Sequence, residues 1–277
     1  MRLSRHWLVA AAVAGALIIS AGARTAPGVF MPLLTSEFGW SRASIGFSVS
    51  IGLILYGLAG PFVGTLIERI GTRNTAIFGM LLIAGSAAAG TTITSELGFT
   101  LFWGALSGLG TGIVGGVLGA TVATRWFVAR RGLVQGMFGA ATSAGQLLFV
   151  PLLALIGAAS GWRMASFILA GVAAVLLIPI VLLVRTDPSD VGLTPYGGEA
   201  VARSGHTADV GIMRTAIRNR DFWLLAAMFF VCGATSNGII GTHLMAHAVE
   251  HGFTTNVAAS VLALIGMMLS LIHISEP

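Results

Sequence analysis

The chain has 277 residues, of which 56% are hydrophobic and 9% charged, and its formal net charge is +5 at pH 7. A soluble domain carries about 25% charged residues, so this composition excludes a water-soluble globular protein and predicts an integral membrane protein. Every basic residue is an arginine, but no arginine-rich face with interleaved aromatic residues is found, which argues against nucleic-acid binding. The single cysteine excludes an intramolecular disulfide and a cysteine-based metal cluster.

Six apolar runs follow one another before Val184. We expect helices at about 7–30, 41–66, 75–94, 99–124 and 132–158, and a sixth that ends near Val184. Each run has about 20 residues or more, enough to cross a hydrocarbon core of about 30 Å. The first run also fits a secretory signal that ends at Ala21-Gly22-Ala23, but it continues beyond that site, so we expect it to be retained. The sequence thus predicts an all-α unit of six helices at residues 1–185.

The chain becomes polar after Arg185. Residues 186–221 are expected to form a charged linker. A seventh helix is expected at about 222–245, and an eighth begins near Asn256 and ends at about 268. Residues 269–277 resemble the translation of a sequencing adaptor, so we expect a non-native tail on a chain cut short; a natural short C-terminus is the alternative. The second unit, residues 222–268, would then hold about one and a half helices.

The arginines are distributed unevenly between the two expected sides of the membrane. With the N-terminus inside, the inside segments hold Arg2, Arg5, Arg69, Arg73, Arg125, Arg130, Arg131, Arg185, Arg203, Arg214, Arg218 and Arg220. The outside segments hold Arg42 and Arg163. Because cytoplasmic loops carry an excess of arginine, this predicts a multi-pass protein of the plasma (inner) membrane with a cytoplasmic N-terminus.

A charged stretch separates the second and third runs and reads Gly64-Thr65-Leu66-Ile67-Glu68-Arg69-Ile70-Gly71-Thr72-Arg73. Its glycines allow a sharp reversal, and its charged residues could pair with one another or cap helix ends. It resembles the loop between the second and third helices of the major facilitator superfamily, Gly-x-x-x-Asp-Arg-x-Gly-x-Arg, with glutamate in the usual Asp place and threonine in one basic place. A plain charged turn is the alternative. The resemblance implies a gating loop formed by Gly64, Glu68, Arg69, Gly71 and Arg73.

The order of segments is also that of a major facilitator chain, whose two six-helix halves each contain two inverted three-helix repeats. Further segments resemble bacterial monocarboxylate-type and oxalate/formate antiporter-type members. They are Phe38-Gly39-Trp40-Ser41-Arg42, Arg125-Trp126-Phe127, Gly161-Trp162-Arg163, Asp187-Pro188-Ser189-Asp190-Val191-Gly192 and Thr242-His243-Leu244-Met245-Ala246-His247-Ala248. The resemblance implies the major facilitator fold, with a complete N-terminal half and the start of a second half.

Arg24 is the one arginine inside an apolar run, past the middle of the first helix. A charge within the membrane is costly and usually marks a transport pathway or a partner. Pro27 leaves the carbonyl of Ala23 without its helical partner, so we expect the helix to be bent or broken there. A guanidinium that faces a wet cavity could hold a carboxylate by two parallel hydrogen bonds. The alternative is that Arg24 extends to the outer membrane interface.

Other polar side chains within the expected helices are candidates for the cavity wall, although hydrogen bonding between helices would explain them equally well. Together with Arg24, the predicted substrate-binding residues are Asn237, Gln146, Tyr56 and His243. His243, His247 and His251 are spaced to share one helix face. That spacing permits metal binding, but partner ligands are few, so we expect no metal and favour a place at the outer mouth or in a proton-sensitive gate.

Glycines recur through the fourth run. Gly110-Thr111-Gly112-Ile113-Val114-Gly115 spells a dinucleotide-binding fingerprint, but it lies in an apolar helix with no strand before it, so we reject a nucleotide site. Four glycines at intervals of four residues predict instead a packing seam for a neighbouring helix. They are Gly104, Gly108, Gly112 and Gly116.

These features predict a secondary active transporter of small organic anions, monocarboxylates above all, that works by alternating access as a uniporter, exchanger or symporter. An arginine without a carboxylate in the same spans fits an anion carrier, with a coupled proton or a counter-anion left open. No arrangement of catalytic residues supports an enzyme, and no cofactor is expected. The alternatives are an exporter of drug-like or other small solutes and a membrane fragment that does not transport, and we expect the 277-residue chain itself to be inactive in transport.

Overall fold

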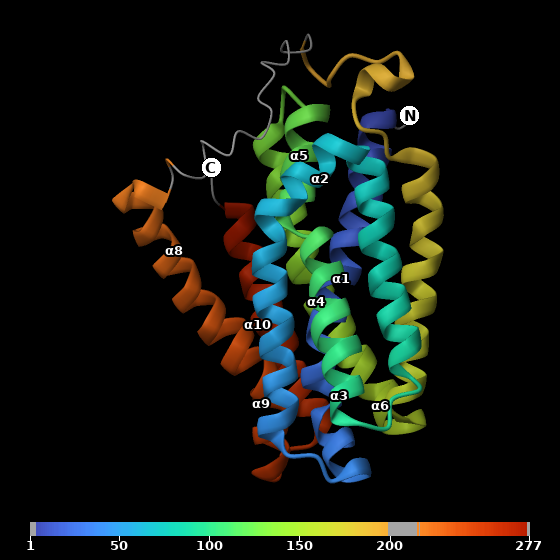
Figure 1. Cartoon of the computed structure of the whole chain (residues 1–277), viewed down its shortest axis with the longest axis vertical. Coiled ribbons are helices and arrows are strands. Elements are labelled where there is room, and N and C mark those ends of the chain that lie inside the picture. The colour runs from blue at the N-terminus through green and yellow to red at the C-terminus, as the bar shows by residue number, and fades with distance from the viewer. Residues whose placement is uncertain (1–3, 199–214, 216, 276–277) are drawn as a thin grey trace.

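The computed structural model describes residues 4–198, 215 and 217–275. These residues are almost entirely helical (Figure 1). The helices are α1 (Arg5–Phe38), α2 (Arg42–Gly90), α3 (Glu96–Phe99), the π-helix η1 (Thr100–Leu106), α4 (Ser107–Ile113), α5 (Gly116–Trp126), α6 (Arg131–Leu183), the 3-10 helix η2 (Pro188–Val191), α8 (Arg220–Cys232), the π-helix η3 (Gly233–Ile240), α9 (Gly241–Glu250) and α10 (Thr255–Ser275). Four runs within the described residues are long and apolar enough to cross a membrane: Arg5–Phe38, Arg42–Gly90, Glu96–Trp126 and Arg131–Leu183.

Two of these four runs fold back on themselves at a glycine. Gly71 in α2 has φ 84° and ψ 159°, and Gly161 in α6 has φ 83° and ψ 159°. A straight helix of 49 residues would be about 74 Å long, more than twice a bilayer core. Each glycine adopts angles that are essentially closed to other residues, and the chain reverses there, as Figure 1 shows for α2. Residues 5–183 therefore run along the bundle six times, as the apolar runs predicted.

The first helix is longer than predicted. α1 continues to Phe38, whereas the sequence predicted a helix that ends at about residue 30, and its C-cap is Gly39 in the left-handed conformation. Met31 and Leu34 are fully buried, so packing against the bundle extends the helix beyond its apolar run. α1 continues through Pro27 as one helix, so the chain is not broken there, and the predicted bend at Pro27 stays a prediction.

The predicted glycine seam holds α4 against α2. A Cβ atom at Gly108 would lie 2.5 Å from the carbonyl oxygen of Gly52, and one at Gly112 would lie 2.8 Å from that of Tyr56. Gly104 is equally close to the backbone of α2, at 2.7 Å from the Ser48 oxygen. These three positions confirm the seam. Gly116 has no neighbour within 4 Å, so its inclusion in the seam is wrong.

Charged and polar contacts are found at both ends of the bundle. Near the N-terminus, the first residues of the predicted linker pack over the ends of α1 and α5: the Tyr196 N–H donates to the Trp126 oxygen at 2.9 Å, and His6 Nε2 lies 2.9 Å from the Thr194 oxygen. At the opposite end, Glu37 pairs with Arg163 after the turn at Gly161. The rest of the predicted linker, residues 199–214 and 216, lies outside the described residues.

Residues after the linker form a second helical part. α8, η3 and α9 follow without interruption from Arg220 to Glu250, five residues beyond the predicted end at 245. α9 packs against α1, and α10 packs against α6, whereas α8 leans away from the bundle (Figure 1). α10 continues to Ser275 instead of ending at about 268, so it includes most of the segment that was predicted to be a tail.

Candidate substrate-binding site

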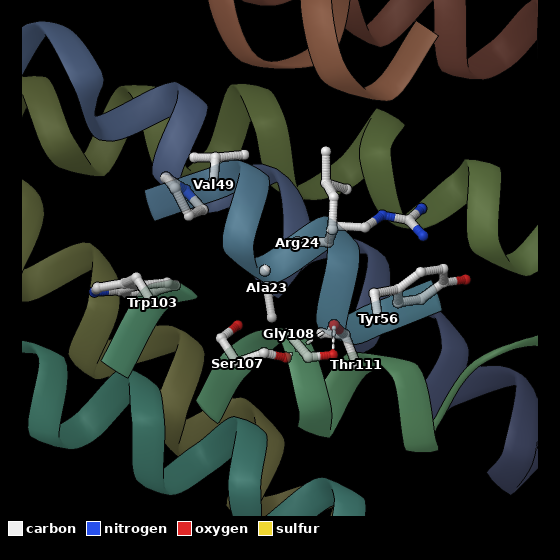
Figure 2. Close-up of a pocket in the computed structure, with 11 residues that line it drawn as sticks. Ala23, Arg24, Val49, Tyr56, Trp103, Ser107, Gly108 and Thr111 are labelled. Carbon is white, nitrogen blue, oxygen red and sulfur yellow. Dashed lines mark hydrogen bonds between the residues drawn. The ribbon is translucent and has the colours of Figure 1, made fainter. Parts of the chain in front are cut away.

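Two adjoining pockets meet at Arg24, about midway along the bundle. The first has about 290 Å³ of empty space, and its wall includes Arg24, Val49, Leu53, Tyr56, Trp103 and Ser107 (Figure 2). The second has about 310 Å³ and is lined by Arg24, Thr25, Gly28, Val49, Leu53, Gln146 and Thr242. Arg24 therefore borders both pockets.

The guanidinium of Arg24 faces α2. Its Cζ atom lies 5.1 Å from the centroid of the Tyr56 ring, and Figure 2 shows the two side chains extending in the same direction. Tyr56 is the fifteenth residue of α2, so it lies about 21 Å from the start of that helix, near the middle of a bilayer-spanning segment. The structure therefore does not support the alternative in which Arg24 extends to the membrane interface.

Arg24 has neither an ion pair nor a hydrogen bond within the described residues, and its Nε atom is buried without a partner. The aromatic contact with Tyr56 compensates part of the desolvation of a cation. A carboxylate would compensate more, because two charge-assisted hydrogen bonds to a guanidinium are about twice as strong as neutral ones. The geometry thus offers an unpaired cation at an open pocket.

The structure brings Tyr56 and Gln146 to Arg24, as the sequence predicted, but not His243. The His243 side chain is exposed and packs against α2, where a Cβ atom at Gly46 would lie 3.2 Å from its Cε1 atom. The backbone of Asn237 lies in η3, but its side chain is outside the described residues. The rings of His247 and His251 lie 4.2 Å apart between centroids and are tilted by 45°, and in residues 4–198 and 217–275 no three potential metal ligands gather.

The sequence did not single out Ser107 and Trp103, which also line the first pocket. Both are buried, with 3% of their surface exposed. Trp103 belongs to η1 and Ser107 begins α4, directly after the π-helix. A serine among glycines in an apolar run only weakly indicates a binding residue. It is the packing of α4 on α1 and α2 that places Ser107 at the pocket.

The predicted gating loop contacts α5 and the linker. Glu68 accepts a hydrogen bond from Arg125 at 2.5 Å, so of the possibilities that the sequence left open, pairing of Glu68 with Arg69 or Arg73 is not the one that the described residues show. Arg125 also lies 4.0 Å from Asp187, so it connects the segment of α2 just before the turn at Gly71 with the linker. At the turn, a Cβ atom on Gly71 would lie 2.5 Å from the hydroxyl of Thr186.

The family model described as Major Facilitator Superfamily matches residues 13–274. The chain belongs to this superfamily. It is 28% identical over 216 residues to the uncharacterized MFS-type transporter YcxA of Bacillus subtilis, covering 78% of this chain and 51% of that protein. It is 30% identical over 199 residues to monocarboxylate transporter 14 of Homo sapiens, covering 68% of this chain and 39% of that protein.

A solved structure shows the same fold. The crystal structure of a D-xylose-proton symporter superposes with a TM-score of 0.67 at 16% identity, over 96% of this chain and 66% of that one. The chain spans about half the length of the curated relatives it matches, or less. These comparisons identify a multi-pass membrane protein with the major facilitator fold, from a family of transporters and not of enzymes.

Proposed function

We propose that the protein acts in secondary active transport of small organic anions, with monocarboxylates as the first class to test. The observation that carries the proposal is the half-buried Arg24, which faces two pockets and has no anionic partner among the described residues. An ionised group in a membrane span is costly unless it is paired. A bound carboxylate supplies the missing charge, which makes Arg24 the anchor of the substrate.

The fold supplies the surroundings for such transport. Residues 1–185 are the N-terminal half, residues 186–221 the cytoplasmic linker and residues 222–268 the start of the second half, and substrate moves as the halves rock about a central site. The arginine distribution gives a cytoplasmic N-terminus in the plasma (inner) membrane. Monocarboxylate transporter 14 is a named relative, which supports this substrate class. A proton or a counter-anion completes the coupling.

The gating loop lies at the end of the bundle that holds the N-terminus. Its proposed role is to hold the cytoplasmic side in one state through Glu68, which already contacts Arg125 on α5. The contact of Gly71 with Thr186 extends this connection to the linker. The loop therefore connects α2, the end of α5 and the linker. A movement of one of these segments would change its contacts with the others.

Carboxylate binding to the purified chain in lipid nanodiscs tests the role of Arg24. We expect lactate to bind in isothermal titration calorimetry, and Arg24→Gln to weaken binding by about 10-fold or more, since a hydrogen bond to a charged group contributes about 1.5–3 kcal/mol. Arg218→Gln is the matched control, because Arg218 is an exposed arginine outside both pockets and outside the gating loop. Equal affinity of the native and Arg24→Gln proteins would overturn the proposal. Binding of a hydrophobic amine but of no carboxylate would favour an exporter of drug-like solutes.

A further inference from the structure

The hydroxyl group of Ser107 forms no hydrogen bond within the described part of the protein. The residue is 3% exposed and lines the first pocket, and Figure 2 shows its oxygen directed toward Ala23 of α1. Within the described part of the chain, no residue forms a hydrogen bond with this oxygen. Unlike the Nε atom of Arg24, which is buried without a partner, the Ser107 oxygen is not fully buried. It is therefore accessible to a ligand in the pocket.

The π-helix before Ser107 explains why its hydroxyl is free. Serine and threonine in a membrane helix usually donate to the carbonyl three or four residues earlier. Thr111 does so, with its Oγ1 donating to the oxygens of Ser107 at 2.8 Å and Gly108 at 3.1 Å. At Ser107, the backbone N–H donates to the oxygens of Phe102 and Gly104, and the π-helix has shifted the local register. Such π turns are frequent at functional sites.

Two more neutral polar residues line the pockets at Arg24. Tyr56 comes from α2 and lines the first pocket, and Gln146 comes from α6 and lines the second. Neither has a hydrogen-bond partner among the described residues. The site thus combines one cation with three separate groups that can donate or accept hydrogen bonds, each on a different helix.

This set of groups fits one class of anion better than another. When the site closes around a plain alkyl carboxylate, the carboxylate pairs with Arg24, but the serine, tyrosine and glutamine groups lose water without gaining partners, which is costly. A carboxylate that carries hydroxyl groups along its chain satisfies them. A site built to bond a substrate hydroxyl rejects the analogue without it far more strongly than an apolar pocket rejects a missing methylene.

We propose that the Arg24 site takes polyhydroxylated carboxylates, the class of the sugar acids, in preference to plain alkyl carboxylates, and that Ser107 is a specificity-determining residue that hydrogen-bonds a substrate hydroxyl. This rests on the proposed anion-binding role of Arg24. Arg24 holds the carboxylate, and Ser107 accepts from or donates to a hydroxyl on the carbon chain in the first pocket.

Calorimetric titration of the 277-residue chain in nanodiscs with D-gluconate and with hexanoate tests this preference, because the two probes share carbon number and charge. We expect gluconate to bind at least about 10-fold more tightly, and Ser107→Ala to remove most of that difference while hexanoate binding stays unchanged. Ser107→Cys, which keeps the volume but bonds weakly, should act in the same way. Ser86→Ala is the matched control, since Ser86 is equally buried but its hydroxyl bonds the Ile83 oxygen at 3.0 Å.

The possible results separate this inference from the function on which it rests. Equal binding of gluconate and hexanoate by the native chain, or an equal loss of both in Ser107→Ala, would overturn the role of Ser107 and leave anion binding standing. No effect of Arg24→Gln on either probe, or no binding of either by the native chain, would instead overturn the anion site. Elution of each variant as a monodisperse peak shows that it has folded.

Discussion

Gly108 allows α4 to approach α2 until backbone touches backbone. A methyl group at this position would be 2.5 Å from the Gly52 carbonyl oxygen, which cannot turn aside as a flexible side chain would. Within a membrane, where burial of apolar surface against lipid contributes little, such close packing is a main source of helix association. The same contact sets the distance between Tyr56 on α2 and Ser107 on α4, so it also shapes the first pocket.

Gly108→Ala should therefore destabilise the protein by about 1–3 kcal/mol, the usual cost of overpacking a dense contact. Gly116→Ala is the control, because nothing lies within 4 Å of a Cβ atom there. The midpoint of thermal unfolding in detergent, followed by tryptophan fluorescence, measures both variants. A Gly108→Ala midpoint equal to that of Gly116→Ala would contradict the tight seam.

The reversal of α2 is the feature that most defines the arrangement of elements. Gly71 has φ 84° and ψ 159°, a region that is essentially restricted to glycine. The same angles recur at Gly161 in α6, at the opposite end of the bundle. The two long helical runs thus turn by the same local device, and each turn is followed by an arginine two residues later, Arg73 and Arg163.

We expect Gly71→Ala to cost about 1–3 kcal/mol, because alanine would have to occupy a strained backbone conformation and its methyl group would meet the Thr186 hydroxyl at 2.5 Å. Gly64→Ala, seven residues earlier in the same stretch and with no neighbour within 4 Å, should be close to neutral. Resistance to limited proteolysis and the unfolding midpoint provide two readings. A similar loss of stability in Gly71→Ala and Gly64→Ala would mean that the backbone conformation at Gly71 does not require glycine.

At the scale of the whole molecule, the second helical part packs on the first through α9 and α10, whereas α8 leans away from it (Figure 1). α9 lies against α1 and α2 at the end opposite the N-terminus, where Arg42 pairs with Glu250 at 2.5 Å. α8 leans away at the other end (Figure 1), and its large apolar side chains, such as Trp223 and Phe230, are exposed. Within the second helical part it is thus α8 that diverges from the bundle, toward the end that holds the N-terminus.

Cross-linking measures this arrangement. In a Cys232→Ser background, which removes the exposed native thiol, the pair Gly46→Cys and His243→Cys should be joined by a short bis-methanethiosulfonate reagent, since the two positions are in contact. The control pair Gly64→Cys and His243→Cys should not be joined, because 18 helical residues separate Gly64 from Gly46 by about 27 Å. Equal cross-linking of both pairs would contradict the described docking of α9.

The ion pair at this contact predicts a pH dependence. The hydrogen bond from the Arg42 guanidinium lowers the pKa of Glu250, in spite of some opposing desolvation, and the charges of His251 and His247 add to the effect. A carboxylate with a lowered pKa stabilises the folded state above its ordinary value of about 4.3 and loses that contribution as the pH falls through the lowered value. Glu250→Gln should thus lower the unfolding midpoint at about pH 6–8, and this difference should disappear on acidification below about pH 4. A difference that grew on acidification would have the wrong sign.

The sequence alone determined the features that depend on local composition. The apolar runs, the glycine seam at Gly104, Gly108 and Gly112 and the family follow from residues that are close together in the chain, because transfer into lipid and close helix approach act on each segment separately. Arg24 stood out for the same reason, since one charge in an apolar run is visible without any neighbour.

Only the tertiary structure decided which residues meet. Glu68 pairs with Arg125, 57 residues later in the chain. α1 extends to Phe38 because other helices bury its last turns. The Ser107 hydroxyl remains without a hydrogen bond among the described residues because a π-helix precedes it and α1 faces it. The reason is that helix length and side-chain pairing depend on contacts between segments far apart in the chain. Local patterns of hydrophobicity and charge carry no information about these contacts.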